Sequence, residues 1–126
     1  MDHIADTSAV IRLPRGDPVV TETLRDKQFA ITFVTLAELC VGAHLADRPA
    51  AAFQAIRQQL SNRLVIGVSQ ATSQFYAQIF VELKRAGQMI PINDIWIAAS
   101  ARQHKLPLIA RDKHFLRVQG LRVIEC

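Results

Sequence analysis

Short apolar segments recur along this chain, and helical segments separate each from the next. Such short, almost wholly apolar strands are typical of sheets that are covered on both faces. We expect strands at residues 3–5, 29–33, 64–66, 108–110 and 122–124. Because helices alternate with them, the pattern predicts an α/β fold, a mainly parallel central sheet of four to five short strands with helices on both faces.

Helix-end signals fall between these strands. Asp17 followed by Pro18 predicts a cap and the first position of a helix. Ser69 is placed to begin the longest helix and Gly87 to close it, while Asn93 is expected to cap the helix after it. The expected helices cover residues 7–13, 18–27, 35–46, 49–60, 69–86 and 94–104, with a further turn or two near residue 115.

The length of 126 residues, half of them hydrophobic, suits one domain over residues 1–126 whose core needs no disulfide or structural metal. Cys40 and Cys126 are too few for a disulfide framework, which indicates a reduced, cytoplasmic protein. No uncharged apolar run reaches the ~18 residues of a membrane span, and the start lacks a signal-peptide pattern. We therefore expect no membrane association.

The net charge of +4 is concentrated near the carboxyl end of the chain. Residues 100–126 hold six basic and two acidic residues, and the rest of the chain is balanced. A localised basic surface attracts polyanions such as nucleic acids, although it also serves simply as a solvated face.

Four acidic residues lie at or just beyond the predicted carboxyl ends of strands. Asp6 closes the first strand, Glu38 lies in the first turn of the helix after the second, Asp94 begins a late helix, and Asp112 follows residues 108–110. The α/β winding can bring all four to one edge. Four close carboxylates raise one another's pKa, and a divalent cation relieves that repulsion. Because all ligands would be oxygens, the set indicates Mg²⁺ or Mn²⁺ rather than zinc, and a site able to hydrolyse phosphodiesters.

Each acid also has a plain structural interpretation. Glu38 completes a capping-box pattern that begins at Thr35, and Asp94 suits any first helical turn. Asp6 fits a simple N-cap, and Asp112 a solvent-exposed turn. The residues alone leave both interpretations open.

Four segments that contain these acids give the chain a resemblance to PIN domains, and most closely to VapC-type ribonuclease toxins. They occur in the family's order and span nearly the whole chain. The matching stretches are Ile4-Ala5-Asp6-Thr7-Ser8-Ala9-Val10, Thr35-Leu36-Ala37-Glu38-Leu39-Cys40-Val41-Gly42, Pro91-Ile92-Asn93-Asp94-Ile95-Trp96-Ile97-Ala98-Ala99 and Leu108-Ile109-Ala110-Arg111-Asp112-Lys113-His114-Phe115.

The resemblance implies a Mg²⁺-dependent endoribonuclease, with Mn²⁺ as a substitute, whose metal site and catalytic residues are the four acids. Asp6 and Asp94 would be direct ligands, and Glu38 and Asp112 would act directly or through water. Attack by metal-bound water would leave a 5′-phosphate. Four further residues would support the metal ligands or contact the substrate: Ser8, Asn93, Arg111 and Lys113. Further contacts with the RNA backbone would come from Arg102, Lys105 and Arg117.

The resemblance also implies partners: an RNA substrate, a homodimer, and an antitoxin that alone would contact DNA. Ala110 departs from the Thr or Ser common in the family, so a hydroxyl near Asp112 is missing from that position. This keeps open a PIN-like module that binds RNA or protein without cutting. An aspartate-based phosphoryl-transfer domain is disfavoured, because Thr7 follows Asp6 where a second acid would be needed. For His114 we expect a surface or phosphate-facing position.

Overall fold

The computed structural model describes residues 2–126, and its five strands form one sheet in the order β3-β2-β1-β4-β5. All four neighbouring pairs of strands are parallel. The strands are β1 (His3–Ala5), β2 (Phe29–Thr32), β3 (Val65–Ile66), β4 (Leu108–Ala110) and β5 (Val123–Glu125). The predicted α/β class is therefore confirmed.

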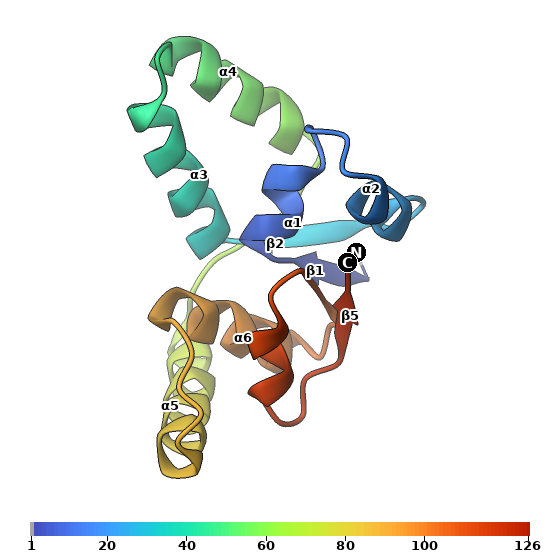
Figure 1. The fold of residues 1–126 in the computed structure, drawn as a ribbon. Helices are drawn as coiled ribbons and strands as arrows, with labels where there is room; N and C mark the ends of the chain where they lie inside the picture. The colour runs from blue at the N-terminus through green and yellow to red at the C-terminus, as the bar shows by residue number, and fades with distance from the viewer. Residues whose placement is uncertain (1) are drawn as a thin grey trace.

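Helices cover both faces of this sheet. Figure 1 shows α1 and α2 on one side of the sheet, and α5, α6 and the short 3₁₀-helix η1 on the other. The helices are α1 (Thr7–Arg12), α2 (Pro18–Leu24), α3 (Phe33–Leu45), α4 (Pro49–Leu60), α5 (Gln70–Ala86), α6 (Ile92–His104) and η1 (Lys113–Arg117).

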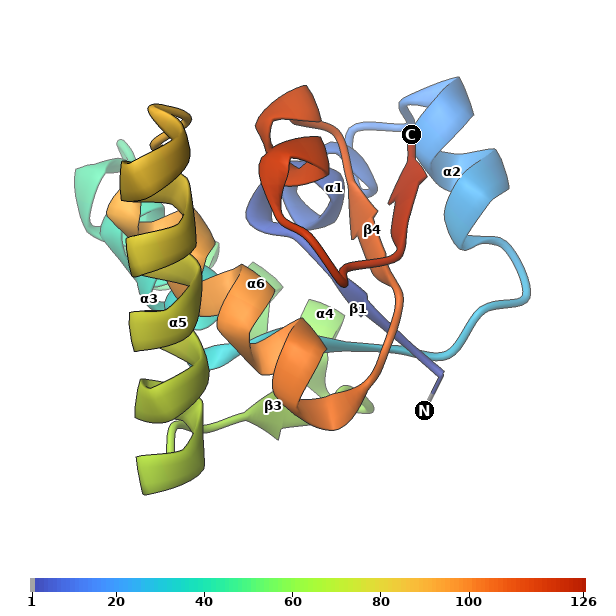
Figure 2. The same ribbon diagram turned by 90° about the horizontal axis from the view of Figure 1, so that it is seen from below.

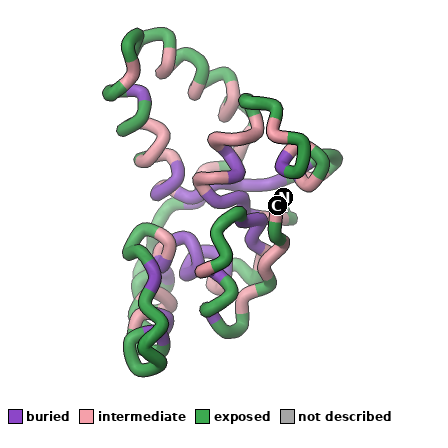
Figure 3. The backbone as a smooth tube through the Cα atoms, in the orientation of Figure 1, coloured by how far each residue is buried: buried purple, intermediate pink, exposed green. Residues whose placement is uncertain are grey.

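The pleat of the central strands divides the core into two layers. Ile4 of β1 and Leu108 of β4 belong to the cluster that contains residues of α5 and α6. Their neighbours Ala5 and Ile109 belong to the cluster formed with α1 and α2. Successive strand residues point to opposite faces, so these strands carry apolar side chains on both faces. Figure 3 shows the buried residues gathered along the sheet and α6.

The longer helices pack in two pairs, α3 with α4 and α5 with α6. Helices α3 and α4 form a hairpin that rises away from the sheet (Figure 1), and α4 has no fully buried residue. On α3, Val41 is 58% exposed and Leu45 is 81% exposed. Helix α5 instead lies alongside α6 in both ribbon views (Figures 1 and 2).

Some element boundaries differ from the predicted ones. Strand β2 ends at Thr32 because the Thr32 hydroxyl accepts a hydrogen bond from the backbone N–H of Thr35 and caps α3. Helix α6 begins at Ile92 after Pro91, so Asn93 is not its cap as expected but its second residue. Helix α2 stops at Leu24 rather than near residue 27, and β5 begins and ends one residue later than expected.

The order of the strands creates a switch point next to β1. The chain first proceeds outward from β1 to β2 and β3, and it then returns to place β4 and β5 on the other side of β1. In parallel sheets of this kind, loops diverge at the switch point and open a crevice beyond the carboxyl ends of the strands. Here the crevice lies where β1 and β4 end.

Candidate active site

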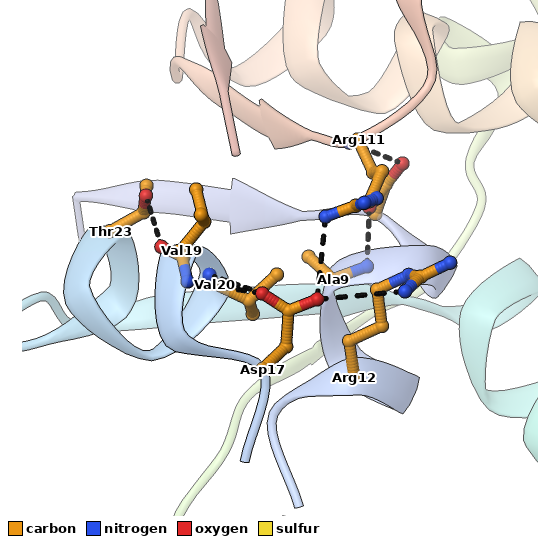
Figure 4. Close-up of polar contacts among 8 residues, drawn as sticks. Ala9, Arg12, Asp17, Val19, Val20, Thr23 and Arg111 are labelled. Atoms are coloured by element: carbon orange, nitrogen blue, oxygen red, sulfur yellow. Dashed lines mark hydrogen bonds and ion pairs between the residues drawn. The ribbon is translucent and has the colours of Figure 1, made fainter. Parts of the chain in front are cut away.

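Asp6 stands at the switch point and is almost completely buried. It follows β1 and caps α1, where its Oδ1 accepts a 2.8 Å hydrogen bond from the backbone N–H of Ala9. Its Oδ2 accepts a 3.4 Å hydrogen bond from the backbone N–H of Arg111, just past β4. Figure 4 shows this region from the side of α1 and α2. The carboxylate is 2% exposed, so two strands and one helix fix its position.

The structure brings all four predicted acids to one cavity. Asp6, Glu38, Asp94 and Asp112 line the same hollow of about 620 Å³, together with residues of the β1–α1 junction and the start of α6. They come from four segments that are far apart in the sequence. The winding of the sheet therefore places their side chains together, as predicted from the strand ends.

Glu38 is held by side chains rather than by a capping box. It lies in the second turn of α3, not the first, and its Oε1 accepts a 2.7 Å hydrogen bond from the hydroxyl of Thr7. The Thr7 hydroxyl is also 3.0 Å from that of Thr35. The capping-box interpretation of Thr35 and Glu38 is wrong, because Thr32 caps the helix. Thr7 was missed as a site residue, since nothing local in the sequence pairs it with Glu38.

Asp94 and Asp112 meet a third polar group, the imidazole of His114. His114 Nε2 lies 2.6 Å from Asp94 Oδ2. A carboxylate oxygen of Asp94, one of Asp112 and a ring nitrogen of His114 all lie within 4.8 Å of one another. Of the two positions expected for His114, on the surface or facing a phosphate, the structure disfavours the surface: His114 lines the cavity.

Two carboxyl groups of the cavity, those of Asp6 and Asp94, resist ionisation. Burial raises the pKa of Asp6 to about 6, and the nearby Asp112 and Asp94 carboxylates add to the rise, whereas the N–H groups of Ala9 and Arg111 oppose it. Burial also raises the pKa of Asp94, against the opposing effect of His114 and with support from Glu38 and Asp112.

This donor set fits a divalent cation. Clustered carboxylate oxygens are the ligands that Mg²⁺ and Mn²⁺ prefer, and a cation would stabilise the ionised form of carboxyl groups whose pKa is raised by burial and, to a smaller extent, by one another. The set is not purely oxygen as expected, however, because His114 contributes a nitrogen within ligand range. An imidazole also suits transition metals, which favours acceptance of Mn²⁺ alongside Mg²⁺.

The remaining predicted site residues occupy different surroundings. Ser8 lines the cavity, and its hydroxyl donates a 3.4 Å hydrogen bond to Asp112 Oδ2, so a hydroxyl reaches Asp112 although Ala110 supplies none. Asn93 is exposed and also lines the cavity. Lys113 is exposed at the start of η1 and is not part of the cavity lining. The guanidinium of Arg111 turns away from the cavity toward Asp17.

Other basic residues that were expected to contact RNA lie elsewhere. Arg102 and Lys105 are at the opposite end of α6 from Asp94 and line a separate hollow with Arg122. Arg102 pairs with Glu82 of α5. Arg117 donates a hydrogen bond to the carbonyl oxygen of Met89. The basic residues near the end of the sequence are therefore divided between the two ends of the sheet.

Comparisons with known proteins agree with this arrangement. The PIN domain family matches residues 4–121. The chain is 32% identical over 125 residues to Ribonuclease VapC4 of Mycobacterium tuberculosis, covering 96% of this chain and 94% of that protein. Among solved structures, it is similar to VapBC-1 of nontypeable Haemophilus influenzae, with a TM-score of 0.89, 26% identity, and coverage of 99% and 98%. It is also similar to VapBC-5 of Mycobacterium tuberculosis, a member of the VapBC family of toxin-antitoxin systems, with a TM-score of 0.81, 29% identity, and coverage of 98% of both chains.

Within residues 2–126, no helix combines the length and the apolar composition needed to cross a bilayer.

Proposed function

This chain belongs to the PIN-domain family and to its VapC ribonucleases, and from that membership we propose that it is the Mg²⁺-dependent endoribonuclease toxin of a toxin–antitoxin pair. The observation that carries the proposal is the single cavity lined by Asp6, Glu38, Asp94 and Asp112 at the switch point of the sheet. The raised pKa of Asp6 and Asp94 supports it, because a cation would stabilise the ionised form of carboxyl groups that burial and neighbouring carboxylates keep protonated.

The residues divide the work of phosphodiester hydrolysis among them. Asp6 and Asp94 would hold the metal, which lowers the pKa of water and offsets negative charge on phosphate oxygens. Asp112, which Ser8 contacts, and His114 would complete the donor set. Mn²⁺ would serve as a substitute for Mg²⁺.

Glu38 is suited to accept the proton of the attacking water, because the Thr7 hydroxyl fixes its side chain at the edge of the cavity. In the resulting reaction, the oxygen of water bonds to phosphorus while the bond from phosphorus to the ribose 3′-oxygen breaks. The departing 3′-oxygen takes a proton from solvent, so the products carry a 5′-phosphate and a 3′-hydroxyl.

The test uses variants that keep the shape of the site. Asp94→Asn and Asp6→Asn should each reduce Mg²⁺-dependent RNA cleavage by at least about 100-fold, since each removes one of the charges that hold the metal. Glu22→Gln removes a carboxylate from the exposed side of α2, where Glu22 pairs with Arg25, and should cleave normally. Sequencing the 5′-phosphate ends left in total RNA would identify the cleaved sites.

A second measurement separates metal binding from activity. Addition of Mg²⁺ to the EDTA-treated protein should raise its melting temperature, because a ligand that binds only the folded state stabilises it. The Asp94→Asn variant should show a much smaller rise. Undiminished cleavage and an unchanged metal response in both Asp variants would contradict the assignment of the site.

We also propose an antitoxin partner and a homodimer. The VapBC names of the similar solved structures support the antitoxin, and the exposed apolar side chains of Val41 and Leu45 on α3 provide uncovered surface. We further propose that DNA is bound only through the antitoxin. Light scattering of the protein alone and with the product of a small adjacent reading frame would measure both assemblies. A monomer that binds no such product would contradict the partner proposals but not the nuclease.

One alternative function is a PIN-like module that binds RNA or protein without cutting it. Ala110 motivates this alternative, but the hydroxyl of Ser8 lies beside Asp112 and all four carboxylates are in place. RNA binding without cleavage in either Mg²⁺ or Mn²⁺ would favour the binding module. Hydrolysis of a phosphomonoester without RNA cleavage would instead favour an aspartate-based phosphoryl-transfer domain.

A further inference from the structure

Two arginines converge on one carboxylate beside the candidate active site. Arg111 Nη1 lies 3.4 Å from Asp17 Oδ2, and Arg12 Nη1 lies 3.5 Å from the same oxygen. Figure 4 shows Asp17 between the two guanidinium groups. We call Arg12, Asp17 and Arg111 the arginine fork. It joins the end of α1, the start of α2 and the segment after β4.

The carboxylate at the centre of the arginine fork is fixed by the backbone at the start of α2. Asp17 Oδ1 accepts hydrogen bonds of 3.1 Å from the backbone N–H groups of Val19 and Val20, so its carboxylate cannot rotate freely. Its side chain is 17% exposed, whereas those of Arg12 and Arg111 are 43% and 38% exposed. The acid is therefore sheltered while the two cations face solvent.

The charges of the fork do not cancel. Two guanidinium groups share one carboxylate, so the fork carries one net positive charge. Each guanidinium has five N–H donors in a planar arrangement, and the contact with Asp17 leaves most of them free. Planar paired donors of this kind match the geometry of phosphate oxygens.

The arginine fork lies next to the carboxylate cavity along the chain, although none of its three residues lines that cavity. Ile11 and Asp112 line the cavity, and they are the sequence neighbours of Arg12 and Arg111. The backbone N–H of Arg111 contacts Asp6 while its side chain reaches Asp17. Arg12 lies six residues beyond Asp6 along α1, about 9 Å at the rise of a helix. That length corresponds to roughly three nucleotides at the rise of a stacked strand.

From this geometry we propose that the arginine fork is a phosphate subsite, in which Arg12 and Arg111, positioned by Asp17, bind an RNA backbone phosphate a few nucleotides from the bond that is cut. The inference rests on the proposed ribonuclease function and adds a substrate contact to it. The arginine fork would contact the RNA backbone and not the bases, so it would position the strand without contributing to sequence specificity.

The test measures RNA binding separately from cleavage. Every protein carries Asp94→Asn and is studied in EDTA with a fluorescein-labelled single-stranded oligoribonucleotide of mixed sequence. Fluorescence anisotropy gives the association constant at several salt concentrations. Each phosphate contact with a single strand contributes about −0.7 to the slope of log K against log salt concentration.

Arg12→Gln and Arg111→Gln should each make that slope shallower by about 0.7, because each removes one cation from the phosphate. Arg12→Lys should keep most of the slope but bind RNA more weakly, since lysine retains the charge and loses the planar donors. Arg85→Gln is the matched control: Arg85 is an exposed arginine of α5, and its loss should leave the slope unchanged.

Asp17→Asn gives the sharpest result, because two effects predict opposite signs. Asparagine still caps α2, but it no longer holds the arginines by charge. Loss of a negative charge alone would strengthen RNA binding slightly, whereas release of two ordered side chains weakens it by about 2- to 10-fold for each. We expect weaker binding by the Asp17→Asn protein despite its more positive charge.

Unchanged slopes for Arg12→Gln and Arg111→Gln in variants that still melt cooperatively would overturn the subsite and leave the arginine fork a structural link only. Tighter binding by Asp17→Asn would also overturn it. If the Asp94→Asn parent binds no RNA and the unaltered chain cuts none, the ribonuclease proposal itself fails. If the Asp94→Asn parent binds RNA but the arginine variants show its salt dependence unchanged, only the phosphate subsite is refuted.

Discussion

At the scale of single residues, Asp6 combines two requirements that conflict in the metal-free protein. Its position between β1, α1 and Arg111 requires burial, whereas its proposed role requires a negative charge. Burial raises its pKa from 3.8 to about 6. The folded protein therefore keeps a proton on Asp6 at pH values where the unfolded chain has lost it. The site stores a free-energy cost that a bound cation would relieve.

This conflict predicts a pH dependence of stability in EDTA. The unfolded chain binds fewer protons than the folded one between the two pKa values of Asp6, so stability falls as pH rises from about 4 to about 6 and stays low above that range. The difference of about 2 pKa units corresponds to about 3 kcal/mol. Melting temperatures should thus be higher near pH 5 than near pH 7, with Asp94, whose pKa is also raised, acting in the same direction.

Asp6→Asn isolates the contribution of this residue. The neutral side chain still accepts the N–H of Ala9 but loses the weaker bond from Arg111. In EDTA, the variant should be more stable than the unaltered protein at pH 7, and the difference should shrink toward pH 5. Equal pH dependence of the two proteins would show that burial of Asp6 does not carry this cost.

Thr7 gives a second prediction for a single residue. Its hydroxyl donates to Glu38 and lies 3.0 Å from the hydroxyl of Thr35, so Thr7→Val leaves Glu38 without its fixed partner. We expect a loss of stability of about 1 kcal/mol and a fall in kcat of about 10-fold, with little change in KM. Thr23→Val on α2, whose hydroxyl bonds only to its own helix, is the control for the stability effect. A change in KM alone would contradict a role in positioning Glu38.

At the scale of elements, the helix boundaries were predicted correctly where one capping signal was present and wrongly where two residues could serve as the cap. Asp17 and Pro18 begin α2, and Ser69 and Gly87 bound α5, as predicted, because these signals act through neighbouring backbone groups. Asn93 and the end of β2 were assigned wrongly. Pro91, rather than Asn93, stands at the cap position of α6, and Thr32 caps α3 and so ends β2.

The start of α5 predicts an effect on stability without an effect on the site. Thr72 is fully buried, accepts the N–H of Ser69 and donates to Gln103 of α6, so it ties the two helices together. Thr72→Val keeps the shape and loses both bonds, which should cost about 1–3 kcal/mol. RNA cleavage should remain normal, because Asp94 lies at the other end of α6. Urea unfolding and a cleavage assay would measure the two effects, and loss of cleavage in a folded variant would contradict their separation.

At the scale of the whole molecule, the sequence predicted which acids meet but not how. Parallel strands place their carboxyl ends at one edge, so the sequence predicted that Asp6 and Asp112 share that edge, and the strand order of the structure makes them neighbours. The contacts of Thr7 with Glu38 and of His114 with Asp94 depend on side-chain directions between segments far apart in the chain. No local spacing encodes those directions. The same is true of the meeting of Arg12 and Arg111 at Asp17.

The distribution of positive charge over the molecule leads to the last prediction. A sequence count treats Lys105 and Lys113 as equivalent members of one basic region, but the fold separates them. Lys113 begins η1 directly after Asp112, whereas Lys105 follows the far end of α6 from Asp94. A helix of 13 residues spans about 20 Å, twice the Debye length of about 10 Å at 0.1 M salt.

Lys113→Gln should therefore lower kcat/KM for RNA several-fold, more strongly at low salt, because it removes a charge next to the carboxylate cavity. Lys105→Gln makes the same change in charge and should leave kcat/KM unaltered at physiological salt. Cleavage rates of the two variants over a series of salt concentrations provide the measurement. Equal losses in both would mean that RNA follows the whole length of α6, and that net charge rather than its placement governs binding.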